Sequence, residues 1–160
     1  MKAWTRIGLV MALVTIVLDQ LSKWFFLEVM RLPDASIDVL PIFKLVMVWN
    51  QGVSFGMFAD EGDGRRWMLI IFSLVIVTVL FQWLRRATNW QAAYGLGLVI
   101  GGALGNVIDR LRFGAVADFF YFHYEKWYWP AFNIADAAIF IGVVLLCWEG
   151  MVSSGDKKEM

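Results

Sequence analysis

Long apolar stretches alternate with polar segments along this chain. Four of the stretches are candidate membrane-spanning helices, at residues 7–27, 67–84, 92–108 and 134–150. At a rise of about 1.5 Å per residue, roughly 18 to 20 residues cross a hydrocarbon core of about 30 Å. The pattern predicts an all-α membrane protein with four transmembrane helices, which form one integral membrane domain over residues 1–160.

The third stretch is rich in glycine, and three glycines recur at a spacing of four, namely Gly97, Gly101 and Gly105. Small residues at this spacing let membrane helices approach each other backbone to backbone. The alternative is a flexible glycine linker, but bulky apolar residues occupy the positions between the glycines. We therefore expect a buried spanning helix that packs closely on a neighbour.

Two longer polar segments separate the first helix from the second and the third from the fourth. Within the first, residues 43–49 alternate in the manner of a short strand, and a turn is expected at Asn50–Gly52. The second carries eight aromatic rings between residues 119 and 129. Such an aromatic belt is typical of the headgroup level of a membrane. The prediction is a small extracytoplasmic, β-containing loop region.

Basic residues in short segments beside the ends of the spans predict the orientation. Lys2 and Arg6 precede the first span and resemble the start of a secretory signal, but no small-x-small cleavage site follows them. The first span is therefore expected to stay attached. The positive-inside rule then places both termini in the cytoplasm, on the side that carries Lys2, Arg6, Arg85, Arg86, Lys157 and Lys158.

Composition narrows the classes of function. The chain is 60% apolar and only 18% charged, with a mean hydropathy of +0.64, and the apolar excess over a soluble domain is expected to face lipid. Its 14 basic and 14 acidic residues balance, which argues against nucleic acid as a partner. The single cysteine, Cys147, and the single histidine, His123, argue against a disulfide and against a zinc site.

Ionisable and amide residues gather where the four spans meet one membrane face. In a four-span chain, the ends of spans one and three and the starts of spans two and four share that face. Ionisable groups at membrane depth are costly and are functional candidates by default. The residues concerned are Asp19, Lys23, Asn106, Asp109, Arg110, Asn133 and Asp136.

Each group also has a purely structural interpretation, and these alternatives stay open at this point. Asp19 and Lys23 are spaced for an intrahelical ion pair, with the lysine reaching up to the headgroups. An ion pair at Asp109 and Arg110 would fix a helix end. Asn133 would cap the fourth helix, and Asp136 would favour its positive end. The segment Asn50–Gly52 would be an ordinary turn, Asp118 a solvated loop carboxylate and His123 interfacial packing.

Elimination suggests a chemistry if the chain is a hydrolase. A nucleophilic triad would have to combine the single His123 with Ser54, Ser73 or Cys147, and the last two lie inside spans. A pair of carboxylates needs no other residue type, because two nearby aspartates share one proton and supply both an acid and a base. Asp118 and Asp136 are the candidates that meet at the mouth of the bundle.

Five sequence blocks resemble the lipoprotein signal peptidase family, also called signal peptidase II. They are Asp19-Gln20-x-Ser22-Lys23, Asn50-x-Gly52-Val53-Ser54-Phe55, Gly102-Ala103-x-Gly105-Asn106-x-Ile108-Asp109-Arg110, Val116-x-Asp118-Phe119 and Phe132-Asn133-x-Ala135-Asp136. All five occur in order, and the resemblance covers residues from about 5 to 150. The small departures, at Ser22 and at Val53 and Ser54, do not touch a carboxylate.

The resemblance implies an intramembrane aspartic endopeptidase of the bacterial inner membrane, with its active site near the outer, periplasmic face. It would remove the signal peptide from diacylglyceryl-modified prolipoproteins by cutting before the lipidated cysteine. Its partners would be lipidated prolipoproteins and membrane lipid, and no cofactor or metal is implied. Asp118 and Asp136 would be catalytic. The residues that would bind substrate or support the site are Asp19, Lys23, Asn50, Gly52, Asn106, Asp109, Arg110 and Asn133.

Two other classes of protein remain as alternatives. A proton-coupled transporter or channel subunit would use the same acids as a proton relay, but it predicts ionisable residues throughout the depth of the membrane. A scaffold with four spans would bind a partner through its aromatic loop, and it predicts that no single aspartate is indispensable. Neither alternative accounts for the five blocks.

Overall fold

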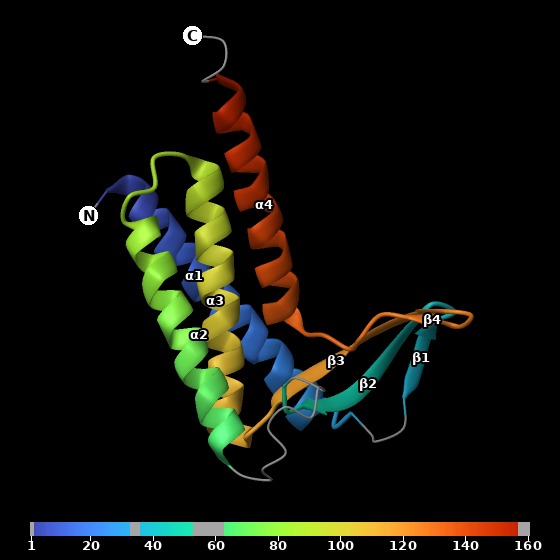
Figure 1. Cartoon of the computed structure of the whole chain (residues 1–160). Coiled ribbons are helices and arrows are strands. Elements are labelled where there is room, and N and C mark those ends of the chain that lie inside the picture. Colours follow the sequence, from blue (N-terminus) through green and yellow to red (C-terminus); the bar gives the residue numbers. More distant parts are fainter. Residues whose placement is uncertain (1, 33–35, 53–62, 157–160) are drawn as a thin grey trace.

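Four long helices form a bundle, and a small sheet extends from one end of it (Figure 1). The structure is a computed structural model that describes residues 2–32, 36–52 and 63–156. Within these residues the helices are α1 (Ala3–Trp24), α2 (Asp63–Leu84), α3 (Trp90–Phe113) and α4 (Ile134–Asp156), and α1 continues into a π-helical turn, η1 (Phe25–Val29). All four helices are long and apolar enough to cross a membrane. The predicted fold class is confirmed.

Helix α3 lies at the centre of the bundle and packs against the other three. A Cβ atom added to Gly101 would lie 2.6 Å from the carbonyl oxygen of Ala12 in α1, so only glycine permits this approach. Gly97 faces the backbone of α1 at Gly8, and Gly105 faces the Asp19 side chain of the same helix, as their spacing predicts. On another side of α3, Gly102 lies directly against Ala135 of α4. The glycines of α3 therefore allow α1 and α4 to pack closely against it.

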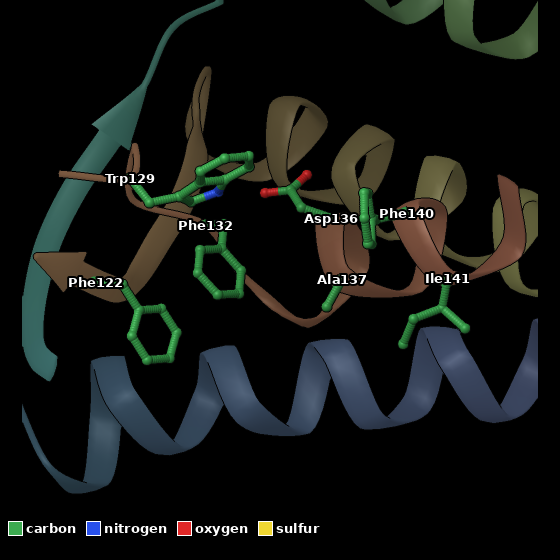
Figure 2. Close-up of a pocket in the computed structure, with 7 residues that line it drawn as sticks. All are labelled: Phe122, Trp129, Phe132, Asp136, Ala137, Phe140 and Ile141. Atoms are coloured by element: carbon green, nitrogen blue, oxygen red, sulfur yellow. The ribbon is translucent and has the colours of Figure 1, made fainter. Parts of the chain in front are cut away.

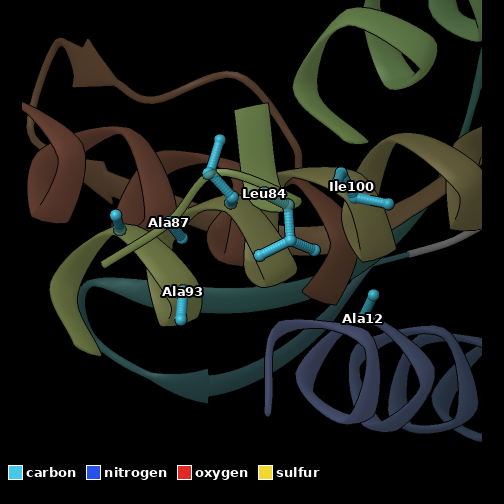
Figure 3. Close-up of a cluster of buried hydrophobic side chains, with 7 residues drawn as sticks. Ala12, Leu84, Ala87, Ala93 and Ile100 are labelled. Atoms are coloured by element: carbon cyan, nitrogen blue, oxygen red, sulfur yellow. The ribbon is translucent and has the colours of Figure 1, made fainter. Parts of the chain in front are cut away.

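A cluster of buried apolar side chains joins α1, α2 and α3 (Figure 3). Leu84 and Ala93 are completely buried in it, and Ala12 and Ile100 nearly so. The outward faces of the helices are apolar as well; Leu13 and Phe72, for example, are more than half exposed. In a membrane protein such surfaces face lipid.

The sheet contains strands β1 (Ile37–Leu40), β2 (Phe43–Asn50), β3 (Val116–Tyr124) and β4 (Trp127–Tyr128), all antiparallel and in that order. The sequence predicted the strand at 43–49, whereas the aromatic run was predicted only as a belt and largely forms β3. The first half of β3 is buried inside the protein: Phe119 is inaccessible, and its ring centroid lies 4.3 Å from that of Phe26. Trp127, by contrast, is 81% exposed.

The ends of α3 lie beyond the predicted 92–108. Asn89 caps its start by accepting a hydrogen bond from the Ala92 amide at 2.8 Å, and Gly114, with φ of +79°, ends it. The charged residues near 110 suggest the end of an apolar span, but they belong to the last turns of the helix. The segment 53–55 of the second block lies outside the described residues, as do Lys157 and Lys158.

Candidate functional site

The polar residues predicted from the sequence come together where the bundle meets the sheet. Helices α1, α3 and α4 and strands β2 and β3 each contribute to this cluster. Hydrogen bonds and ion pairs connect every predicted member into one network, which contains Asp19, Lys23, Asn50, Gly52, Asn106, Asp109, Arg110, Asp118, Asn133 and Asp136.

Asp118 lies in β3 and is 1% exposed. Asn133 Nδ2 donates to its Oδ1 at 2.7 Å, and Asn50 Nδ2 donates to its Oδ2 at 3.0 Å. Burial raises the pKa of Asp118 to about 7; the hydrogen bond from Asn50 opposes this shift and the negative charge of Asp136 adds to it. A carboxyl group with this pKa carries its proton for much of the time at neutral pH.

Asp136 lies in the first turn of α4 and is only partly buried. Asn106 Nδ2 donates to its Oδ1 at 2.8 Å, and the backbone amide of Asn133 donates to its Oδ2 at 3.3 Å. In return, the backbone amide of Asp136 donates to Asn133 Oδ1 at 3.0 Å. This is a reciprocal cap of the helix start. The capping interpretation of Asn133 is therefore right, yet its Nδ2 remains directed at Asp118.

Two asparagines link the two carboxyl groups. Asn133 Nδ2 lies 2.7 Å from Asp118 and 3.2 Å from the side-chain oxygen of Asn106, whose own Nδ2 donates to Asp136. Every carboxyl oxygen of Asp118 and Asp136 accepts a hydrogen bond from an asparagine. The two aspartates are thus held as a unit by groups that do not titrate.

A buried ion triad lies behind these asparagines. Lys23 Nζ is 2.8 Å from Asp19 Oδ2 and 2.7 Å from Asp109 Oδ2, and Lys23 is only 1% exposed. The alternative in which Lys23 reaches up to the headgroups is therefore wrong. Sequence reasoning also overlooked Gln20, whose Nε2 donates to Asp19 and to Asp109. Its position next to Asp19 in the first block was the available signal.

Two further residues hold the edge of the cluster. Gly52, with φ of +88°, donates its backbone amide to Asn50 Oδ1 at 2.8 Å. The turn interpretation is right here too, and this turn leaves Asn50 Nδ2 free to reach Asp118. Arg110 Nη1 donates to the backbone oxygen of Asn106 at 3.3 Å.

An apolar cavity of about 540 Å³ opens beside Asp136. Figure 2 shows the Asp136 carboxyl group directed into the space between Trp129 and Phe140. The remaining wall is apolar, and it is formed by Phe122, Phe132, Ala137 and Ile141. A carboxyl group at the edge of an apolar cavity is suited to act on a polar bond within a largely apolar ligand.

Known proteins resemble this chain over most of its length. The sequence matches the family described as Signal peptidase (SPase) II over residues 11–152. A lipoprotein signal peptidase of Methylorubrum extorquens (strain PA1) is 45% identical over 147 residues, which are 91% of this chain and 86% of the relative. The lipoprotein signal peptidase of Rhodopseudomonas palustris (strain ATCC BAA-98 / CGA009) is 42% identical, over 92% of this chain and 93% of the relative.

Solved structures resemble the fold. A bacterial membrane enzyme determined by the in meso method at 2.3 Å resolution superposes with a TM-score of 0.78, at 25% identity, over 96% of this chain and 92% of that one. A second bacterial membrane enzyme, at 1.9 Å resolution, has a TM-score of 0.76 and 26% identity, over 89% of this chain and 90% of the other. The four-helix arrangement with its sheet is thus shared with membrane enzymes.

Proposed function

The chain belongs to the signal peptidase II family, and on that premise we propose that Asp118 and Asp136 are the catalytic dyad of an aspartic endopeptidase. As a lipoprotein signal peptidase, the chain removes signal peptides from prolipoproteins, and it is a multi-pass membrane protein. The transporter alternative is not supported. The observation that carries the proposal is the pairing of the two carboxyl groups through Asn106 and Asn133 at the edge of an apolar cavity.

The proposed mechanism divides the roles between the two aspartates by their surroundings. Asp118 is buried, and its raised pKa supports a protonated carboxyl group at rest, which would donate a hydrogen bond to the scissile carbonyl oxygen. Asp136 is directed into the cavity, where an ionised carboxylate would take a proton from the attacking water. The water oxygen forms a bond to the carbonyl carbon, and the Asp118 proton moves to the carbonyl oxygen.

Collapse of the resulting tetrahedral diol completes the reaction. The proton gained by Asp136 passes to the leaving peptide nitrogen, the carbon–nitrogen bond breaks, and one diol hydroxyl returns a proton to Asp118. The dyad is thereby restored, and one water has been consumed. Because the two carboxyl groups accept and return every proton that the scheme transfers, the scheme needs no metal or cofactor.

The remaining predicted residues have supporting roles in this proposal. Asn50, Asn106 and Asn133 orient the carboxyl groups. Gly52 permits the turn that presents Asn50, and Arg110 braces Asn106 through its backbone oxygen. The apolar cavity next to Asp136 would accept the apolar residues or acyl chains that flank the cleavage site, which we place just before the diacylglyceryl-modified cysteine.

We also propose a placement in the cell. The protein would be a single integral membrane domain over residues 1–160 in the bacterial inner membrane. Both termini would lie in the cytoplasm, and the site would lie near the outer face, beside membrane lipid. The uneven distribution of basic residues and the position of the sheet at the end of the bundle opposite the termini support this placement (Figure 1).

The test is cleavage of a diacylated prolipoprotein by the purified protein in detergent. We expect the wild type to release the signal peptide, and Asp118→Asn and Asp136→Asn each to remove nearly all turnover. Asp63→Asn is the matched control, because the Asp63 side chain is 77% exposed at the start of α2 and forms a peripheral ion pair with Arg66. A chelator should leave the rate unchanged. Normal cleavage by a folded Asp118→Asn or Asp136→Asn protein would overturn the dyad.

A further inference from the structure

Each carboxylate of the buried ion triad accepts a hydrogen bond from a backbone amide, and the residue that carries this amide directly precedes one of the two dyad residues. Asp19 Oδ1 accepts a hydrogen bond from the backbone amide of Ala135 at 3.0 Å, and Ala135 precedes Asp136. Asp109 Oδ2 accepts one from the backbone amide of Ala117 at 3.2 Å, and Ala117 precedes Asp118. These contacts link α1 to α4 and α3 to β3.

Lys23 joins the two halves of this arrangement. Its ammonium group contacts both carboxylates, and it also donates to Asn106 Oδ1 at 3.3 Å. An ammonium group can only donate, so it forces the amide oxygen of Asn106 toward itself and the Nδ2 group toward Asp136. In the reversed orientation of this amide, an oxygen would face the Asp136 carboxylate.

None of the three residues is accessible to a substrate. Asp19 and Asp109 are completely buried, Lys23 is 1% exposed, and all three are absent from the lining of the apolar cavity. Within the part of the chain that the structure describes, their side chains form hydrogen bonds and ion pairs with each other, with Gln20, with Asn106 and with the two backbone amides. Any effect of the triad on catalysis therefore has to pass through the groups that it holds.

We propose that Asp19, Lys23 and Asp109 form a positioning unit, which fixes the backbone before both catalytic aspartates and the orientation of the Asn106 amide. The unit contributes to turnover and not to substrate binding. The triad consists of two carboxylates and one ammonium group, so its formal net charge is one negative unit. A hydrogen-bond donor contacts each of the four carboxylate oxygens. The proposal rests on the aspartic dyad proposed above.

The test separates positioning from simple charge balance. Lys23→Met alone leaves two buried carboxylates without a counterion and is expected to destabilise the fold. Lys23→Met combined with Asp109→Asn restores the net charge of the triad and keeps an oxygen that can accept from Ala117. Lys23→Met with Asp109→Leu has the same charge but removes that acceptor. For each variant, the melting temperature in detergent and the kcat and KM for a diacylated prolipoprotein are measured.

If the triad is a positioning unit, the charge-balanced Lys23→Met/Asp109→Asn protein regains most of its melting temperature and keeps its KM, while kcat stays about 10- to 100-fold below wild type. The Asp109→Leu version loses more kcat, because Ala117 is also released. Wild-type kcat in a stable charge-balanced variant would overturn the proposal and reduce the triad to a structural element.

Two further comparisons keep the test decisive. If the Lys23 variants do not fold, Asp109→Asn and Asp109→Leu at an intact Lys23 make the same comparison, and equal kcat values in the two would overturn the proposal. Asp118→Asn is measured alongside. If it retains turnover, the dyad itself is wrong, whereas loss of turnover there with normal kcat in the triad variants rejects only the positioning unit.

Discussion

Asp118 and Asp136 lie in unequal surroundings. Asp118 is almost completely buried, whereas Asp136 borders a cavity of about 540 Å³. Burial disfavours a carboxylate, and the amide donors of Asn50 and Asn133 only partly offset that penalty. The same residue type is thereby suited to hold a proton at one position and to accept one at the other.

The raised pKa of Asp118, about 7, predicts how turnover depends on pH. If the protonated form of Asp118 is required, kcat should fall as the pH rises through about 7, and a second fall at acidic pH should mark protonation of the pair's remaining carboxylate. The profile should be bell-shaped, with limits that belong to the pair and not to either residue. A rate that keeps rising above pH 8 would contradict Asp118 as the acid. The measurement is kcat at saturating substrate across pH 4 to 9.

The same shift predicts a change in stability with a definite sign. The folded pKa of Asp118 lies above the ordinary value of 3.8, so the folded protein binds this proton more tightly than the unfolded chain. The contribution is complete below pH 3.8 and is lost as the pH rises through about 7. Wild type should therefore lose more melting temperature than Asp118→Asn between pH 5 and pH 8. Equal losses in the two proteins would argue against this pKa.

If the aspartates act as a unit, their substitutions should be strongly non-additive. Asp118→Asn removes the acid and Asp136→Asn removes the base, so each should lower kcat by several orders of magnitude. Adding the second substitution should then cost little more. The measurement is kcat for both single variants and the double variant, each checked for folding by its melting temperature. Two effects that multiply in the double variant would show that the residues act independently.

The bundle depends on close contact between α1 and α3. Gly101 lies against Ala12 and Thr15, and a Cβ atom there would come within 2.7 Å of the Thr15 Cβ. Gly101→Leu should therefore push the helices apart, and overpacking typically costs about 1 to 3 kcal/mol. We expect a lower melting temperature in detergent. Gly64→Leu in α2 is the control, because a Cβ atom at Gly64 meets nothing within 4 Å. Equal stability of the two variants would show that this contact is unimportant.

The sequence predicted the helices better than the sheet, for a physical reason. A spanning helix satisfies its own backbone and needs only a long apolar stretch, so length and hydropathy reveal it. A strand depends on its partner, and β3 pairs with β2 across a separation of more than 60 residues. Its run of consecutive aromatic residues shows no alternation between apolar and polar, so residues 119–124 were predicted only as a belt.

The site shows the same division between local and distant contacts. The predicted residue types and their convergence on one face follow from helix spacing and from the parity of the spans. The hydrogen-bond and ion-pair partners of each side chain do not follow from spacing. The Lys23 ammonium group, for example, forms an ion pair with Asp109 on another helix. Asn133 both caps α4 and binds Asp118. A structural and a functional interpretation of one residue can therefore both hold.

The parity of four helices places both termini at one end of the bundle and the sheet with the polar cluster at the other (Figure 1). The joint between α2 and α3, which includes Asn89, lies with the termini, and the start of α2 at Asp63 lies with the sheet. A substrate whose signal peptide spans the membrane would therefore meet the dyad at one leaflet only, and the orientation of the protein decides which leaflet.

The distribution of basic residues predicts that this leaflet is the outer one. Lys2, Arg6, Arg85 and Arg86 flank span ends on the side of the termini, where the positive-inside rule places the cytoplasm. In a Cys147→Ala background, a cysteine at position 63 should react with a membrane-impermeant maleimide in intact cells, and one at position 89 should react only after the membrane is opened. Both positions lie at helix ends, so neither label has to enter the bundle. The opposite pattern would place the dyad at the inner leaflet, and the proposed orientation would have to be abandoned.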